Sequence, residues 1–134
     1  MIIRTDLASE STDTLETRLV ELEAVIARAR SLQVFVLREL DVRQVPMVDG
    51  CRSLAEWMVS RMDVAPESAA SISRLVYSES EPVEVALASG EITTDRAVEL
   101  TRLESDDPVG EAEGFAIPRL RSRIATRRRL TRHR

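Results

Sequence analysis

The stretch from Asp49 to Leu103 carries helix start and stop signals at short intervals, and these limit it to a series of short helices. Ser53 and Glu56 have the spacing of a capping box, in which the serine oxygen accepts a hydrogen bond from the glutamate amide. Pro66 suits the first position of a later helix, where its missing amide hydrogen has no cost. The chain is therefore predicted to be all-α.

The first two of these helices have the outline of a helix-turn-helix. We expect them over residues 54–62 and 66–78, joined by a tight turn in which Asp63 adopts the left-handed conformation. Helical hairpins that never touch DNA show similar apolar spacing, so the pattern leaves both a DNA-reading pair and a purely structural pair open. The apolar positions that would pack the two helices together are Val59, Met62, Val64, Ala69 and Ile72.

Later signals predict further helices and divide the chain into parts. Pro82 begins a short helix that Gly90 stops, and Thr93 caps another helix that runs to about Glu104. Pro118 can begin a last, arginine-rich helix. The parts are a loose N-terminus (1–12), a long helix (13–46) that gives way to a linker over residues 44–50, a helical core with the helix-turn-helix-like pair (49–105), and a second linker with an Arg-rich C-terminal helix or tail (106–134).

The long helix carries an apolar stripe with coiled-coil spacing. Asp13 and Glu16 form a second capping-box pattern, and the helix that follows should reach about Val42. Its apolar residues alternate four and three positions apart, and Gln33 interrupts them at a position that suits register control. Two interpretations stay open: the stripe packs on its own domain, or it pairs two chains as a homodimer. The seam positions are Leu15, Leu19, Leu22, Ile26, Ala29, Gln33 and Val36, with Leu40 beyond them and Val25, Leu32 and Phe35 beside them.

The charge of the chain is strongly segregated, although its formal net charge is only −4. Residues 1–118 contain 11 arginines and all 23 acidic residues, which gives −12. Residues 119–134 contain 8 arginines and no acidic residue, which gives +8. A basic end on an acidic body indicates a polyanionic partner, such as the phosphates of DNA.

The arginine-rich end is the best candidate for a binding site. In one interpretation its guanidinium groups contact phosphates, and about five such contacts would give log affinity a slope of about −4.5 against log salt. In the other, this end improves solubility or folds back on the acidic body. The arginines are Arg119, Arg121, Arg123, Arg127, Arg128, Arg129, Arg132 and Arg134.

Short segments spread along the chain form a recognisable combination. They are Gly50-Cys51-Arg52-Ser53-Leu54-Ala55-Glu56-Trp57, Pro66 with Ala69-Ala70, Ala86-Leu87-Ala88-Ser89-Gly90-Glu91-Ile92-Thr93, and Arg128-Arg129-Leu130-Thr131. From about Thr14 to Arg132, the chain resembles the N-terminal part of the 13E12-repeat family, also called domain of unknown function 222. Those actinobacterial and phage proteins often carry an HNH nuclease domain at their C-terminal end. The resemblance implies an all-helical domain associated with DNA-acting proteins, and it implies no known activity for this domain.

Two features depart from that family. Relatives usually continue past the point where this chain ends, and their nuclease motif lies there. An HNH site needs a histidine base and metal-binding side chains, but the only histidine is His133, so we predict no nuclease activity and no metal site. The expected recognition helix, which is often basic in relatives, has a single arginine here, Arg74. Its candidate DNA contacts are Ser68, Ser71 and Arg74.

Composition bears on the cellular compartment and on whether the chain binds a membrane, a metal or a cofactor. Cys51 is the only cysteine, so no disulfide can form within the chain, which suits a reducing cytoplasm. No apolar run approaches the length of a membrane span, and the first residues lack the apolar segment of a signal peptide, so we expect no membrane association. No cofactor or small-molecule substrate is indicated, because the chain has no Gly-rich phosphate loop and no set of metal-ligand spacings.

These observations favour a non-enzymatic, cytoplasmic, DNA-associated module, either a small regulator or a truncated relative of an HNH-linked protein. Two alternatives stay open. The chain could be a protein–protein interaction module that acts through the long helix or the acidic body. It could also be an accessory domain of an HNH endonuclease whose catalysis is supplied elsewhere.

Overall fold

The computed structural model describes residues 4–132 of the chain, and within that range it contains 9 helices and no strand. The prediction of an all-α fold is therefore confirmed. None of these helices is both long enough and apolar enough to cross a membrane. The helices are α1 (Arg4–Ala8), α2 (Thr12–Val42), α3 (Val45–Val48), α4 (Leu54–Met62), α5 (Pro66–Val76), α6 (Glu81–Ser89), α7 (Thr94–Leu100), α8 (Pro108–Glu111) and α9 (Ile117–Arg132).

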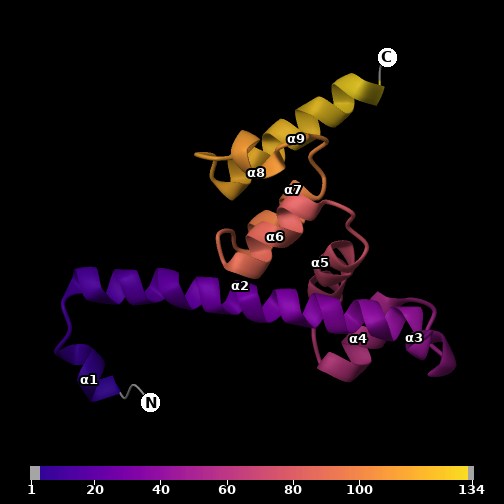
Figure 1. The fold of residues 1–134 in the computed structure, drawn as a ribbon, viewed down its shortest axis with the longest axis horizontal. Helices are drawn as coiled ribbons and strands as arrows, with labels where there is room; N and C mark the ends of the chain where they lie inside the picture. Colours follow the sequence, from indigo (N-terminus) through magenta and orange to yellow (C-terminus); the bar gives the residue numbers. More distant parts are fainter. Residues whose placement is uncertain (1–3, 133–134) are drawn as a thin grey trace.

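Helix α2 is the longest element, and the other helices are arranged around it (Figure 1). Its 31 residues span about 46 Å at the usual rise per residue. Helices α3 and α4 lie near its C-terminal end, and α5, α6 and α7 contact it between its middle and that end, with the end of α6 reaching Ala24. Helix α9 packs on α7, and α8 packs on α6, so these two helices form the part of the fold farthest from α2.

The helix-turn-helix-like pair forms where the local signals predict it. The Ser53 side chain accepts from the Glu56 amide at 3.1 Å, which is half of the predicted capping box. The Glu56 carboxylate accepts from the Arg52 amide at 3.3 Å and not from the serine amide. Asp63 ends α4 in the left-handed conformation with φ 53°, and Pro66 begins α5. These local interactions fix a tight turn between α4 and α5.

The N-terminal part differs from the sequence-based expectation. Helix α1 lies within residues 1–12, which were expected to be loose. Helix α2 begins earlier than predicted, because Ser11 is extended and its oxygen accepts from the Thr14 amide at 3.1 Å. The predicted capping box at Asp13 therefore does not form. Asp13 lies instead in the first turn, where its negative charge is favourable.

Two further boundaries differ. The predicted linker over residues 44–50 contains the short helix α3, entered through Gln44 in the left-handed conformation (φ 58°). Helix α7 ends at Leu100 and not near Glu104. The amides of Arg102 and Leu103 bond to carbonyls three residues earlier, and this tightens and closes the last turn.

The face of α2 that packs on the body is not the predicted seam. The buried residues of α2 are Ala27, Ser31, Val34 and Leu37. The α2 seam, defined as Leu15, Leu19, Leu22, Ile26, Ala29, Gln33 and Val36, is exposed throughout, with Leu19 at 65% and Val36 at 60%. The interpretation that the seam packs on its own domain is therefore wrong. Small side chains at Ala27 and Ser31 allow the body to approach a different side of the helix.

Gly90 lies where α6 comes closest to α2. It has φ 79° and ends α6, as predicted. A Cβ added at this position would stand 3.0 Å from the Ala24 carbonyl oxygen and 3.1 Å from the Ala24 Cβ. Both the positive φ and the close backbone approach therefore require glycine.

Arg38 joins three helices from the C-terminal half of α2. Its Nε donates to the Val76 carbonyl at 3.0 Å, and its Nη2 donates to the Leu75 carbonyl at 3.2 Å and the Ser78 carbonyl at 3.4 Å. Its Nη1 contacts the Glu84 carboxylate of α6 at 2.7 Å. One side chain thus satisfies the orphan carbonyls at the end of α5 and pairs with an acid of α6.

We expect Gly90→Ala to be more destabilising than Gly50→Ala. Both glycines have positive φ, 79° and 83°, but nothing lies within 4 Å of a Cβ built on Gly50. Gly50→Ala should lower the free energy of unfolding by about 1 kcal/mol, and Gly90→Ala by about 2–3 kcal/mol, because only the second also crowds α2. Urea denaturation measures both values, and equal losses would contradict the close approach.

Loss of the Arg38 guanidinium should also weaken the fold. Arg38→Met keeps the aliphatic stem but leaves several carbonyls and Glu84 without their partner, so we expect a loss of about 3 kcal/mol. Arg43→Met is the matched control, since Arg43 makes only an exposed pair with Glu39 at 3.8 Å, and it should cost less than about 0.5 kcal/mol. Thermal and urea unfolding of both variants provide the comparison.

Candidate nucleic-acid interface

Helix α9 carries the predicted basic residues and docks on the body through its apolar side. Leu120 and Ile124 are buried against the core. Arg119 and Arg123 lie over the ring of Phe115, at 5.1 and 4.6 Å from its centroid. These contacts fix one side of α9 to the body and leave its other side exposed.

Two arginines of α9 pair with acids of the body. Arg121 Nε donates to the Glu99 carboxylate at 2.8 Å, and Arg127 contacts the Glu111 carboxylate at 2.6 Å. Glu99 is buried, and Arg102 approaches its second oxygen at 3.9 Å. A buried carboxylate is stable only with such partners. Arg121 and Arg127 are thus engaged within the chain, as the fold-back interpretation of the tail expects.

The connection before α9 is held by Arg96 of α7. Its Nη1 donates to the Ala112 carbonyl at 3.3 Å, and its Nη2 donates to the Phe115 carbonyl. Arg96 lies in the first turn of α7, where the Thr93 side chain caps the helix by accepting from the Arg96 amide at 3.1 Å. The position of α9 on α7 is therefore set by hydrogen bonds as well as by apolar packing.

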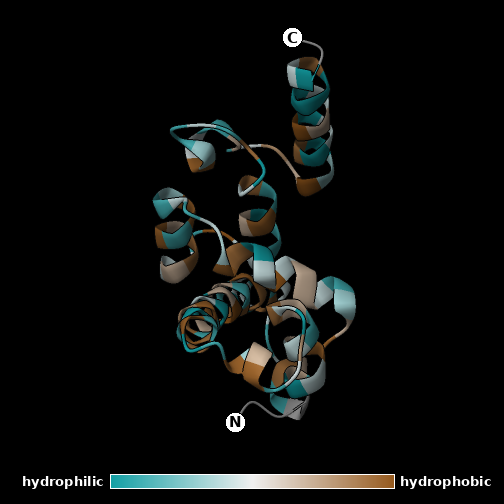
Figure 2. Ribbon diagram, turned by 90° about the vertical axis from the view of Figure 1, so that its right-hand side faces the viewer, coloured by the Kyte–Doolittle hydropathy of each residue, from teal (hydrophilic) through white to brown (hydrophobic). Residues whose placement is uncertain are grey.

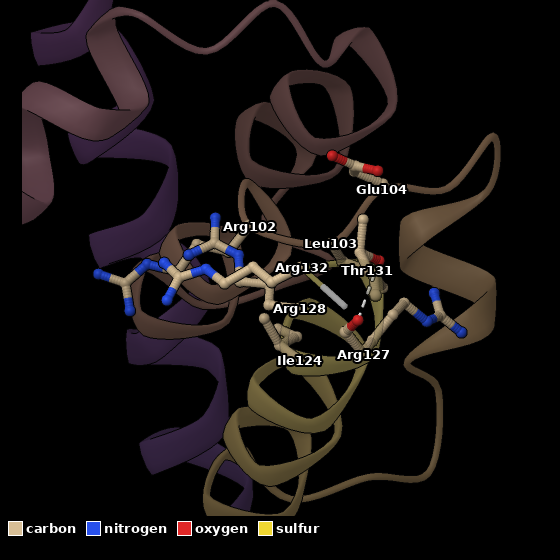
Figure 3. Close-up of a pocket in the computed structure, with 8 residues that line it drawn as sticks. All are labelled: Arg102, Leu103, Glu104, Ile124, Arg127, Arg128, Thr131 and Arg132. Carbon is tan, nitrogen blue, oxygen red and sulfur yellow. Dashed lines mark hydrogen bonds between the residues drawn. The ribbon is translucent and has the colours of Figure 1, made fainter. Parts of the chain in front are cut away.

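Four other arginines gather from three parts of the fold into a basic cluster, which we define as Arg74, Arg102, Arg128 and Arg132. Figure 3 shows the side chains of Arg102, Arg128 and Arg132 extending to the same side of a hollow, while Arg127 points away from them. The acidic residue at this hollow, Glu104, lies at its far end in the same view. The apolar lining is Leu103 and Ile124.

Arg74 reaches the cluster from α5. Burial, and then the positive charges of Arg102 and Arg128, lower the pKa of the Arg74 guanidinium below its usual value. The nearby Glu99 opposes this shift, and it is already paired with Arg121 and Arg102. Like charges have therefore been brought close enough to repel one another, which makes an anion a favourable occupant.

The structure brings together only some of the predicted contact residues. Arg128 and Arg132 line one hollow with Arg102, and Arg74, beside the neighbouring hollow, is close enough to feel the charge of Arg128, whereas Ser68 and Ser71 of α5 line neither hollow. Ser68 is exposed and Ser71 is half-buried. The remaining basic candidates on α9, Arg119, Arg123 and Arg129, are exposed outside the hollow. His133 and Arg134 lie outside the described residues.

Sequence reasoning did not single out Arg102. It follows α7 directly and is the one basic residue between Arg96 and Arg119. A single arginine at the C-terminal end of a helix is common, because its charge interacts favourably with the helix dipole. The sequence therefore gave no reason to assign Arg102 to a binding site. A second hollow beside the cluster, lined by Ala70, Ser73, Arg74, Tyr77, Ser78, Glu79, Ser80 and Thr101, was also not predicted.

The arrangement favours binding of anions. Guanidinium groups present planar donor pairs that match phosphate oxygens, and they stay charged at neutral pH. Across residues 4–132, no three His, Cys, Asp or Glu side chains come close enough to hold a metal ion. Comparison with protein-family models, with curated proteins and with solved structures finds no match to this chain.

A multivalent anion should stabilise the protein through the basic cluster. We expect inorganic pyrophosphate, at about ten times its dissociation constant and at constant ionic strength, to raise Tm by about 4 °C. Arg128→Gln should remove this shift because it takes one donor from the hollow, whereas Arg129→Gln, outside the hollow, should retain it. Thermal unfolding with and without pyrophosphate tests this, and equal responses of the two variants would contradict the site.

Proposed function

We propose that this chain is a non-catalytic helical module that binds DNA through its phosphate backbone. The observation that carries the proposal is the basic cluster, in which arginines from the end of α7 and from α9 line one hollow, with Arg74 of α5 close enough to feel the charges of Arg102 and Arg128. Side chains held on separate packed elements keep their spacing without a partner, so less ordering is needed when phosphates bind.

The division of roles follows from the charges. Helix α9 supplies most of the affinity, through Arg128, Arg129 and Arg132. Helix α5 adds Arg74 and helps to set placement on the duplex, with Ser68 and Ser71 as further polar groups on its surface. Its first turn also contains Glu67, so base reading by α5 is weak and the binding depends little on sequence.

The resemblance to the 13E12-repeat family fits this proposal. In that setting the chain would be a small regulator, a truncated relative of an HNH-linked protein, or an accessory domain that positions DNA for a nuclease active elsewhere. An open reading frame for an HNH domain next to the coding sequence would favour the last two possibilities. Without one, the regulator is favoured.

A second candidate function is supported by a different observation. The α2 seam is apolar and exposed over most of the length of the helix, and such a surface is typical of a protein–protein contact. An interaction module would use this seam and would need no DNA. The two functions are separable, because the seam and the basic cluster share no residue.

The salt dependence of DNA binding tests the proposal. With phosphate contacts from the basic cluster and Arg129, the slope of log affinity against log salt should be about −4.5, and Arg128→Gln with Arg132→Gln should reduce it to about −2.7. Arg43→Gln removes one charge at the end of α2 and should leave the slope near the wild-type value. Gel-shift titrations of a duplex at several salt concentrations measure these slopes.

Point substitutions are preferable to removal of the tail. Deletion of residues 119–134 would also remove the buried Leu120 and Ile124, and a loss of binding could then reflect a loss of fold. Salt-insensitive binding by the wild type, or a double variant with an unchanged slope, would rule out binding through the cluster. Circular dichroism confirms that each variant keeps its helices.

A further inference from the structure

The α2 seam is an apolar surface that the fold leaves exposed, with Leu7 of α1 beside its N-terminal half at Leu15, Leu19 and Leu22. The body covers a different side of α2, at Ala27, Ser31, Val34 and Leu37, and these buried positions begin only near the middle of the helix. Figure 2, which views α2 nearly end-on, shows hydrophobic residues around the helix and not along a single side. A helix that is apolar on two sides ordinarily buries both.

The seam has the period of a two-stranded coiled coil. In heptad terms, Leu19, Ile26 and Gln33 occupy a positions, and Leu15, Leu22, Ala29 and Val36 occupy d positions. A strict seven-residue repeat drifts around a straight α-helix, so it stays in register only with a partner helix that supercoils with it. The partner must therefore carry a similar repeat on an exposed helix.

We infer that the α2 seam pairs with the α2 seam of a second copy of this chain, in antiparallel orientation. In this arrangement Leu19 packs opposite the partner's Val36, and Ile26 packs opposite the partner's Ala29. The two-fold axis passes between these central layers, so one set of residues forms both halves of the contact. This inference does not rest on DNA binding.

The charges beside the seam select the orientation. Antiparallel pairing sets Arg18 against the partner's Glu39, and Glu23 against the partner's Arg30, and each contact occurs twice by symmetry. It also sets the apolar Val25 against the partner's Leu32, both of which are otherwise exposed. Opposite charges face opposite charges at Arg18 and Glu23, and apolar residues face each other at Val25, whereas Glu16 lies opposite the partner's Leu37, which its own body buries.

A parallel pair is less complementary. It would keep one favourable contact, between Arg18 and the partner's Glu23. It would set Val25 against the partner's Arg30, and it would direct Glu39 toward the partner's Gln44, which lies beyond the end of α2. It would also bring both bodies to the same end of the coil, because the body sits on the C-terminal half of α2.

Two charged residues that the antiparallel pair would use lack an ionic partner within the chain. Neither Glu23 nor Arg30 forms an ion pair with any described residue. Arg30 donates to the Gln33 side chain at 2.7 Å, but its Nε is buried without an acceptor. A carboxylate brought by a second chain would balance this guanidinium.

Sedimentation of matched glutamate variants tests the association. The wild type should sediment with twice the mass of one chain, and Ile26→Glu should sediment as a monomer, because it buries a charge in the central layers. Val20→Glu is the control, since Val20 is 71% exposed on a different side of α2 and its variant should remain a dimer. A monomeric wild type, or dissociation by both variants, would overturn the inference.

Disulfide trapping tests the orientation, in a Cys51→Ser background that removes the native thiol. Antiparallel pairing predicts that a mixture of Leu19→Cys and Val36→Cys chains forms disulfide-linked dimers. Leu19→Cys alone should form none, because its two thiols would lie about 25 Å apart along the coil. Ready cross-linking of Leu19→Cys alone would show a parallel pair and overturn the proposal.

Charge exchange gives an independent measure of the same contact. Arg18→Glu should weaken dimerisation by about tenfold, because it sets an acid opposite the partner's Glu39 in both of the symmetric contacts. Adding Glu39→Arg should restore the affinity in an antiparallel dimer. Rescue by Glu23→Arg, without rescue by Glu39→Arg, would overturn the antiparallel assignment.

Discussion

One guanidinium group holds the centre of this fold together. Arg38, near the C-terminal end of α2, satisfies the terminal carbonyls of α5 and pairs with Glu84 of α6. Arg38 binds α6 at its first turn, and the opposite end of α6 lies against α2 where Gly90 approaches Ala24. Once α5 and α6 are fixed on α2, α7 packs between them, and α9 has a surface on which to dock. The candidate site therefore depends on a contact far from it in the sequence.

The basic C-terminal helix is joined to the acidic body by a small number of specific ion pairs. Glu99 and Glu111 engage Arg121 and Arg127, and these pairs orient α9. In this orientation Arg128 and Arg132 of α9 lie beside Arg102, with Arg74 of α5 nearby. The carboxylates at this place are fewer than the guanidinium groups, so positive charge is in excess. Internal ion pairs thus create a site of excess positive charge, which is the property that a polyanion recognises.

Local chemistry was the predictable part of this protein. The Ser53 cap, the left-handed Asp63 and Gly90, and the Thr93 cap all involve residues close in sequence, and all four form. The candidate site was predictable only in part. The arginines of α9 stood out as a charge run, but Arg102 did not, because its role depends on a partner helix that begins fifteen residues later.

The sequence by itself determined most of the longer helices, the caps at Ser53, Gly90 and Thr93, and the seven-residue repeat of α2, because each depends on spacings of three to seven residues. Only the tertiary structure decided which face of α2 the body covers. A stripe of leucines predicts burial but not the surface that buries it, and here small residues at Ala27 and Ser31, with the reach of Arg38, directed the body to another side. The contacts that hold the body on that side join α2 to α5 and α6, which are distant in sequence. Local spacing alone therefore could not predict that the seam would stay exposed.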